Sequence, residues 1–344
     1  MREQKSILII YTGGTIGMEK DPDRGTLKPF DFDNIVESIP ELNKFGYDIQ
    51  AHSFSPAIDS SNIHPGIWIK IADLIEQEYE NFDGFVVLHG TDTMAYSASA
   101  LSFMMENLSK PVIFTGAQLP IGTLRTDGKE NLITAIEIAS AYENGKPVVP
   151  EVCIYFESKL YRGNRTTKVN AEHFNAFQSA NYPYLAKAGV NLVYNREFIL
   201  AQKEKEPLVL HRNFSDQITI LKLFPGINKE YMDAILEIAG LRAVILETYG
   251  SGNAPSEPWF IDRMQRAVER GIILLDVTQC SRGSVELGRY ETSKSLLDAG
   301  VISGYDITTE AATTKLMILL GQELAVNEIK MLLNKSLKGE ITLA

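Results

Sequence analysis

The sequence predicts an α/β protein with two parallel-sheet domains, of which the second is the smaller. Two observations support this prediction. Apolar runs of strand length alternate with helical segments in both halves of the chain, which is the pattern of βαβ units. In addition, the chain has 344 residues, about twice the usual single-domain length of roughly 150 residues, so two cores are expected.

The N-terminal half contains most of the predicted strands. In chain order these are Ser6–Tyr11, Tyr47–Phe54, Gly84–Leu88, Pro111–Thr115 and Val152–Phe156. Helices, recognised by apolar residues at helical spacing, are predicted to begin at Pro65, after Thr93 and near Glu130. Between the first two strands, a loop to about Phe30 is rich in Gly, Asp, Lys and Pro, and this composition predicts a mobile segment, for which a lid is one use.

A break in the alternation predicts the domain boundary. Residues 195–214 include a charged, solvated stretch and are predicted to be a linker between domains 1–194 and 215–344. In the second domain the predicted strands are Ile218–Phe224, Ala243–Leu246 and Ile272–Val277. The predicted helices of this domain are Lys229–Ile238, Pro258–Arg270, Glu310–Leu320 and Val326–Lys335.

Composition excludes several classes of protein. The net charge of −11 would repel phosphate backbones and anionic lipids, so neither nucleic acid nor a membrane is expected as a partner. The two cysteines are too few for a disulfide framework or a thiolate metal site. The sequence has no apolar run of membrane-spanning length and no signal-peptide pattern. We therefore expect a cytoplasmic enzyme or binding protein.

Two threonine-bearing turns directly follow predicted strands. They are Tyr11–Gly17 (YTGGTIG) and His89–Thr93 (HGTDT). In an open parallel sheet, the loops at the carboxyl ends of the strands converge on one crevice, so both turns can face the same ligand. Thr15 and Thr91 would then offer their hydroxyls to it, and a threonine hydroxyl becomes a nucleophile when a neighbouring base removes its proton.

Each turn also has a purely structural explanation. The glycines of the first turn can serve a tight turn with positive φ. They do not have the Gly-x-Gly-x-x-Gly spacing of a dinucleotide loop, and no Walker lysine follows. In the second turn, Thr91, Asp92 or Thr93 can cap the helix that follows. We expect His89 to be structural rather than catalytic.

Two further polar segments follow predicted strands. The segment Leu160–Lys168 (LYRGNRTTK) is basic, and a solvated loop is its ordinary explanation, but Lys168 could reach the crevice and transfer protons there. The segment Asp59–Asn62 (DSSN) could bind a small zwitterion through its hydroxyls and turn amides, or simply cap the helix at Pro65.

Taken together, YTGGTIG, DSS, HGTDTMAYSASALSF and YRGNRTTK resemble, in this order and spacing, the cytoplasmic (type I) bacterial L-asparaginases. The likeness continues through PVIFTGAQLP, TYGSGNAP and VTQC and so covers nearly the whole chain. It implies a flavodoxin-like N-terminal domain and a smaller C-terminal α/β domain. It also implies a homodimer or homotetramer that needs neither metal nor cofactor.

The resemblance further implies hydrolysis of L-asparagine to L-aspartate and ammonia. Thr15 would be the nucleophile and form a β-acyl ester. Thr91, Asp92 and Lys168 would form a triad that activates either this nucleophile or the water that resolves the ester. Backbone N–H groups around Gly90 and Thr91 would hold the oxyanion, an interaction whose loss typically raises the barrier by ~3 kcal/mol.

The same resemblance implies how the substrate is held. Ser60 and Ser61 would bind the α-carboxylate, and Asp92, with Asp59 as a further candidate, would bind the α-ammonium group. The choice between asparagine and glutamine depends on one methylene, worth about 1–3 kcal/mol, and the sequence leaves it open.

The sequence departs from the family pattern at two places. Some members have a tyrosine near the nucleophile, whereas the corresponding stretch here, Arg24–Lys28, has none. Some also bind a regulatory asparagine through residues that match Thr167, Asn253 and Cys280, together with an arginine that is Glu247 here. Because a carboxylate should repel the effector's carboxylate, we expect weak or absent cooperativity.

Two other functions are compatible with the same residues. The chain could be an asparagine or aspartate sensor without turnover, although a sensor needs only the pocket and not two hydroxyls with a lysine. It could also be the ammonia-producing subunit of a tRNA amidotransferase. Such subunits carry a β-rich domain before the first motif, whereas ten residues precede Tyr11 here.

Overall fold

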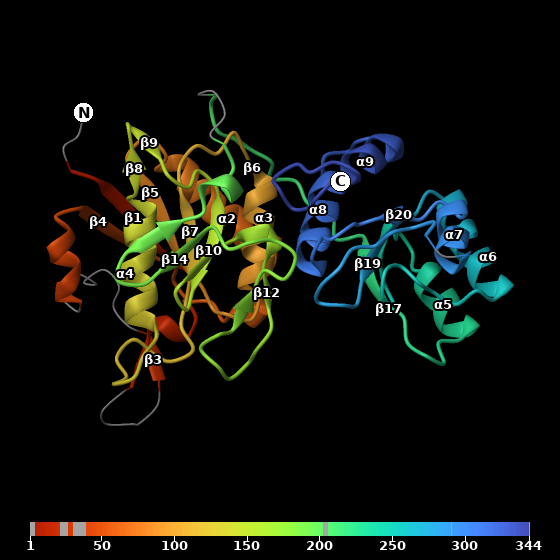
Figure 1. Ribbon diagram of the computed structural model, residues 1–344, viewed down its shortest axis with the longest axis horizontal. Helices are drawn as coiled ribbons and strands as arrows, with labels where there is room; N and C mark the ends of the chain where they lie inside the picture. Colours follow the sequence, from red (N-terminus) through yellow and green to blue (C-terminus); the bar gives the residue numbers. More distant parts are fainter. Residues whose placement is uncertain (1–3, 21–26, 30–38, 202–205, 290, 344) are drawn as a thin grey trace. The chain divides into compact units, whose positions relative to one another are not determined.

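The computed structural model describes residues 4–20, 27–29, 39–201, 206–289 and 291–343 (Figure 1). The chain forms two compact units, Met1–Leu210 and His211–Ala344. The division falls inside the segment 195–214 that the sequence predicts as a linker. Both units are built around parallel strands covered by helices, so the predicted α/β class is confirmed.

An eight-stranded sheet forms the centre of the first unit. Its strands, in spatial order, are β15 (Leu192–Tyr194), β14 (Ala186–Ala188), β11 (Lys159–Arg162), β10 (Val152–Phe156), β7 (Val112–Thr115), β5 (Gly84–Leu88), β1 (Ser6–Tyr11) and β4 (Asp48–Ser53). The strands from β10 to β4 are parallel, as predicted. The sheet continues past β10 with three antiparallel strands that the sequence did not predict.

Helices cover both faces of this sheet. The helix α4 (Gly128–Ala139) packs its Leu132 and Ile136 onto one face, against Ile9 and Val86. Figure 1 shows α2 (Pro65–Gln77) and α3 (Met94–Met104) on the other face. The helix α3 is buried around almost its whole circumference, which suits its run of alanine, serine and apolar residues. Each fully buried isoleucine or leucine contributes about 1.5–3 kcal/mol to folding.

Short elements complete the first unit. Its small strand pairs are β2 (Met18–Lys20) with β3 (Leu27–Pro29), β6 (Met105–Glu106) with β16 (Val209–Leu210), β8 (Tyr142–Glu143) with β9 (Lys146–Pro147), and β12 (Thr167–Lys168) with β13 (Phe177–Gln178). Its 3-10 helices include η1 (Thr15–Gly17), η3 (Pro40–Phe45), η4 (Ser60–Asn62), η5 (Gly163–Arg165) and η6 (Arg196–Phe198).

The second unit has a four-stranded parallel sheet. Its strands, in order, are β17 (Ile218–Lys222), β18 (Ala243–Thr248), β19 (Ile273–Thr278) and β20 (Ile302–Ser303). The helices α5 (Lys229–Leu236), α6 (Pro258–Glu269) and α7 (Glu291–Asp298) share one core with these strands, and α8 (Thr309–Gly321) and α9 (Val326–Leu333) follow (Figure 1). In the described parts of both units, every helix is too short or too polar to cross a membrane.

Candidate active site

The carboxyl ends of neighbouring strands in the first unit lie level with one another. Tyr11, the last residue of β1, pairs in register with Leu88 of β5 and with Ser53 of β4. Leu88 in turn pairs with Thr115, the last residue of β7. The turns that follow these four strands therefore leave the sheet at one edge, as the parallel order predicts.

Two glycines let the turns after β1, β4 and β5 touch. Gly14 has a φ of 89°, and a Cβ atom built on it would lie 2.5 Å from both the N and the Cα of Gly90. Gly13 has a φ of 140° and would clash in the same way with the carbonyl oxygen of Ile58. Left-handed φ and close backbone approach both require glycine here. We call this close approach of Gly14 and Gly90 the glycine crossing. Thr15 directly follows Gly14, and Thr91 directly follows Gly90.

Lys168 connects the two polar residues of the second turn. Its Nζ donates to Thr91 Oγ1 over 2.8 Å and to Asp92 Oδ1 over 2.7 Å. The Lys168 side chain is 16 % exposed and that of Asp92 is 67 % exposed, so solvent screening makes the ion pair weak as a source of stability. The structure thus brings together the three residues of the predicted triad, whose chemical role remains a proposal.

The chain before Lys168 is anchored inside the first unit. Arg162 Nε contacts Glu151 Oε2 at 2.6 Å, and their side chains are 3 % and 5 % exposed. Arg165 is also buried. Breaking a buried ion pair of this kind typically costs about 3–5 kcal/mol. A solvated loop is therefore the wrong explanation for the basic segment, because its arginines are folded into the unit and hold β12, which ends at Lys168.

Thr15 opens the 3-10 helix η1 and is partly exposed. Within the described part of the chain, its hydroxyl has no hydrogen-bond partner. Two buried neighbours fix the turn around it: Ile16 packs in the core, and Tyr11 donates its hydroxyl proton to Gly17 O over 3.1 Å. Burial raises the pKa of Tyr11 to about 12, so this tyrosine stays protonated and cannot serve as a base at neutral pH.

Part of the expected lid, residues 21–26 and 30, lies outside the described residues, and this part includes residues 24–26 of the stretch Arg24–Lys28. The residues on either side of 21–26 form the strand pair β2 and β3.

The segment Asp59–Asn62 caps itself rather than the helix at Pro65. Asp59 Oδ1 accepts bonds from the N and the Oγ of Ser61, each over 2.9 Å, and these bonds lower the pKa of Asp59. The helix at Pro65 is instead capped by His64, whose Nδ1 accepts from Gly66 N. Among the three predicted substrate-binding residues of this segment, Ser60 is buried, while Asp59 and Ser61 are exposed.

The hydroxyls after β5 do not act as helix caps either. Thr93 is the N-cap residue of α3, but its side chain accepts no bond from the helix and donates to Ser60 O over 2.7 Å. This bond ties the turn after β5 to the turn after β4. The capping explanation is therefore wrong for Thr93, and the Thr91 hydroxyl belongs to the lysine contact described above.

His89 is structural, as expected. It is 1 % exposed, and its Nδ1 lies 2.7 Å from Gly90 O, which can only accept, so Nδ1 carries the proton. Its Nε2 accepts from Ser97 Oγ over 2.9 Å, and Ser97 Oγ in turn accepts from Trp68 Nε1. Burial lowers the pKa of His89 to about 4. The neutral ring joins the turn after β5 to α2 and α3.

Gln118 was missed at the sequence level although its motif, PVIFTGAQLP, was noted. It lies in the turn after β7, and its Oε1 is 3.4 Å from Thr91 Oγ1. Its Nε2 donates to His173 O over 3.1 Å and to Ala171 O over 3.4 Å. The available signal was its place directly after a strand of the parallel sheet.

The predicted regulatory residues lie in both units. Thr167 belongs to β12 in the first unit, whereas Glu247, Asn253 and Cys280 belong to the second. Glu247 is a partly buried carboxylate at the end of β18, and it accepts from Thr309 Oγ1 over 2.8 Å. Lys222 Nζ lies 3.5 Å from its other oxygen.

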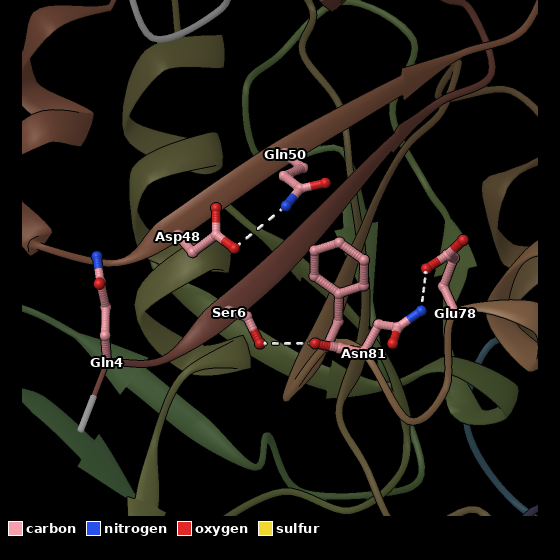
Figure 2. A pocket seen from close by; sticks show the side chains of 7 residues that line it. Gln4, Ser6, Asp48, Gln50, Glu78 and Asn81 are labelled. Carbon is pink, nitrogen blue, oxygen red and sulfur yellow. Dashed lines mark hydrogen bonds between the residues drawn. The ribbon is translucent and has the colours of Figure 1, made fainter. Parts of the chain in front are cut away.

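A polar pocket of about 660 Å³ lies elsewhere, at the amino ends of β1 and β4. Figure 2 shows hydrogen bonds among the residues that line it: Gln50 donates to Asp48, Asn81 donates to Glu78, and Ser6 donates to the backbone oxygen of Asn81. None of the candidate catalytic residues lines it. The threonines lie at the opposite ends of the strands, so this pocket is not the candidate active site.

Comparison with known proteins identifies the family. Residues 6–200 match the family model "Asparaginase, N-terminal", and residues 217–333 match "Glutaminase/Asparaginase C-terminal domain". The chain is 42 % identical to L-asparaginase 1 of Escherichia coli K12 over 99 % of both chains. It is 41 % identical to the 60 kDa lysophospholipase of Mus musculus, covering 64 % of that protein. The crystal structure of L-asparaginase I from Vibrio cholerae superposes with a TM-score of 0.91 at 42 % identity, over 99 % of this chain and 100 % of that one. The chain therefore belongs to the asparaginase family.

Proposed function

We propose that this protein hydrolyses L-asparagine to L-aspartate and ammonia through an acyl ester on Thr15. The observation that supports this most strongly is the Thr91–Lys168–Asp92 contact beside the crossing of the two threonine turns. Such a cluster has what amide hydrolysis needs, namely a hydroxyl nucleophile and a base within hydrogen-bond reach of a second hydroxyl.

In the proposed reaction, Thr15 Oγ1 attacks the side-chain carbonyl carbon of asparagine. The amide nitrogen leaves as ammonia, and water then cleaves the ester to release aspartate. Thr91, Asp92 and Lys168 activate either the Thr15 hydroxyl or this water. The partly exposed hydroxyl of Thr15 is consistent with the first step, because it is engaged by no other described residue.

Backbone amides are proposed to stabilise the negative charge that develops on the substrate carbonyl. The N–H groups near Gly90 and Thr91 precede α3, and a helix start favours an anion. The exposed Ser61 and Asp59 and the largely exposed Asp92 are available to bind the two charged α-groups of a free amino acid. Ser60 is buried and can contribute less.

We further propose a cytoplasmic location and a homodimeric or homotetrameric assembly. Both rest on the likeness to cytoplasmic bacterial asparaginases. Size-exclusion chromatography with light scattering tests the assembly directly, and a monomer would refute it.

The reaction is tested by initial rates of ammonia release from L-asparagine and L-glutamine with the purified protein. Turnover that favours asparagine is the expected result. Preference for glutamine would correct the substrate and keep the reaction class. Release of ammonia from neither, together with asparagine binding measured by calorimetry, would refute the proposal in favour of a sensor.

A further inference from the structure

The amide of Gln118 has an orientation that its surroundings dictate. Its Nε2 faces two backbone carbonyl oxygens, those of Ala171 and His173. Carbonyl oxygens can only accept hydrogen bonds, so the NH₂ group must point toward them. The Oε1 atom, which is an acceptor, therefore points toward Thr91, and the reverse orientation would place two pairs of acceptors face to face.

Further hydrogen bonds hold both the backbone of Gln118 and the 170–173 turn that faces its amide group. The N atoms of Gln118 and Leu119 donate to the carboxylate of Asp127, over 3.0–3.1 Å. On the other side, Asn170 Oδ1 accepts from the N atoms of Glu172 and His173, each over 2.8 Å. The acceptor near Thr91 is thus fixed in place before any substrate binds.

The Thr91 hydroxyl has one proton to donate, and two neighbouring atoms, Lys168 Nζ and Gln118 Oε1, decide where this proton points. When Lys168 is an ammonium, its Nζ donates into Thr91 Oγ1, and the Thr91 proton can then point only to an acceptor such as Gln118 Oε1. When Lys168 has lost a proton, its nitrogen can itself accept from Thr91. Gln118 therefore favours the charged form of Lys168.

We infer that Gln118 is a positioning residue of the reaction, which orients the Thr91 hydroxyl proton and so sets the pH at which Lys168 gives up its own proton. This inference rests on the proposed function. Among charged groups, Asp92 bonds Lys168 directly, whereas Asp127 accepts from the backbone of Gln118 and Leu119 and from Asn131 Nδ2, and both carboxylates are unchanged in the variants below.

The test compares Gln118→Met with Asn170→Ala. The methionine keeps the length of the side chain but removes both the acceptor and the donor. The alanine removes the acceptor that orders the 170–173 turn and so loosens the partner of Gln118 Nε2, but it keeps the Oε1 acceptor on residue 118. The reactivity of Lys168 toward acetic anhydride is followed against pH by mass spectrometry of the labelled peptide, which requires no catalytic turnover. Thermal unfolding confirms that each variant folds.

In Gln118→Met, we expect Lys168 to become reactive at a pH lower by about half a unit to one unit, the size of one neutral hydrogen bond. The kcat for asparagine should fall about threefold to tenfold, with KM nearly unchanged and the acid limb of the kcat profile displaced in the same direction. Asn170→Ala should displace the midpoint of Lys168 labelling less than Gln118→Met does, because the Oε1 acceptor is still present.

If the midpoint pH of Lys168 labelling is the same in Gln118→Met as in the parent protein, the inference is overturned. Equal displacement in both variants would also overturn it, because the effect would then come from order in the 170–173 turn. If the parent protein releases no ammonia, the proposed function fails, but the labelling experiment still decides whether Gln118 sets the protonation of Lys168.

Discussion

The two units end their parallel sheets in different ways. At the carboxyl edge of the first, the Thr15 hydroxyl is bonded by no described residue, and Thr91 is bonded to a lysine. At the corresponding edge of the second, polar side chains bond to the unit's own residues. Glu247 accepts from Thr309, and Thr248 Oγ1 donates to Asp276 Oδ1 over 2.7 Å.

We propose that the edge of the first unit is the reactive one and that the edge of the second unit is structural. In the second unit, Gln279 Nε2 donates to the carbonyl oxygens of Leu223 and Glu247, and Thr278 donates to Gly250 O, so these side chains hold loops together. In the first unit, the loops are held together instead by the close backbone contacts of Gly13 and Gly14 and by His89. Parallel topology alone therefore predicts where a site can form, and the threonine hydroxyls near a lysine favour the edge of the first unit as the place of the proposed site.

Loss of the reactive hydroxyl should have the largest effect. Thr15→Ala removes the proposed nucleophile, and we expect turnover of asparagine to fall by more than about a thousandfold. Thr15 lies on a partly exposed turn, so thermal unfolding should change little. The matched variant Thr15→Ser keeps a hydroxyl and should retain measurable activity. Near-normal rates in Thr15→Ala would remove Thr15 from the mechanism.

Lys168→Met should have the next largest effect. It removes the amine from Thr91 and Asp92, and loss of this acid–base assistance should lower kcat by roughly a hundredfold or more. The control is Lys187→Met, which removes an exposed lysine from β14. We expect the control to keep full activity, and equal losses in the two variants would show that Lys168 acts only through general surface charge.

The glycine crossing can be broken sterically. Gly14→Ala would place a methyl group 2.5 Å from Gly90 N, and φ at Gly14 is 89°. Gly46→Ala is the matched control, because Gly46 has a φ of 65° with nothing within 4 Å of the added atom. We expect Gly14→Ala to be less stable in urea than the control by roughly 1–3 kcal/mol, through overpacking. Equal stabilities would mean that the two turns can separate freely.

The stability of the second unit should depend on pH through Asp276. Burial raises its pKa from 3.8 to about 7, and its Oδ2 accepts no hydrogen bond from any residue that the structure describes. The folded state therefore holds the Asp276 proton more tightly than the unfolded state. The stability that this provides is full below pH 3.8 and is lost as the pH rises through about 7.

Asp276→Asn should remove this part of the pH dependence. Urea unfolding of the two proteins across the range from pH 3.8 to about 7 should show a flatter stability profile for the variant. His89 acts in the opposite sense, because its pKa is lowered to about 4, but it is present in both proteins and cancels from the comparison. Parallel profiles would mean that Asp276 is ionised in the folded protein throughout this range.

The smallest effect is expected at Glu247. Its carboxylate lies where some relatives are expected to have an arginine for an effector carboxylate, so asparagine should not bind there. The rate should then follow a hyperbolic dependence on asparagine concentration. A clearly sigmoidal curve would contradict this prediction and would show that the second unit, or its contacts, still regulates the first.

The sequence predicted the parallel part of the fold well. Runs such as Gly84–Leu88 and Val152–Phe156 are apolar throughout and match β5 and β10 residue for residue. The antiparallel strands β11 and β14 were missed because they are short and carry exposed or half-exposed lysines, Lys159 and Lys187, in place of an apolar run.

The candidate site was predicted only in part, for a similar physical reason. The threonine turns could be found because glycine and threonine directly after a buried strand form a strong local pattern. Burial of Arg162 depends on Glu151, a partner from another strand end, and spacing alone does not reveal it. Gln118 was missed because a single glutamine has no pattern of its own, and its role appears only once the 170–173 turn is placed opposite it.

The most direct test is to quench the parent protein and Lys168→Met during turnover of L-asparagine and to locate any covalent adduct by peptide mass spectrometry. We expect an aspartyl ester on Thr15. If the triad activates the water, more of this ester should accumulate in Lys168→Met than in the parent protein. An aspartyl ester on Thr91, with none on Thr15, would contradict the proposed role of Thr15 as the nucleophile.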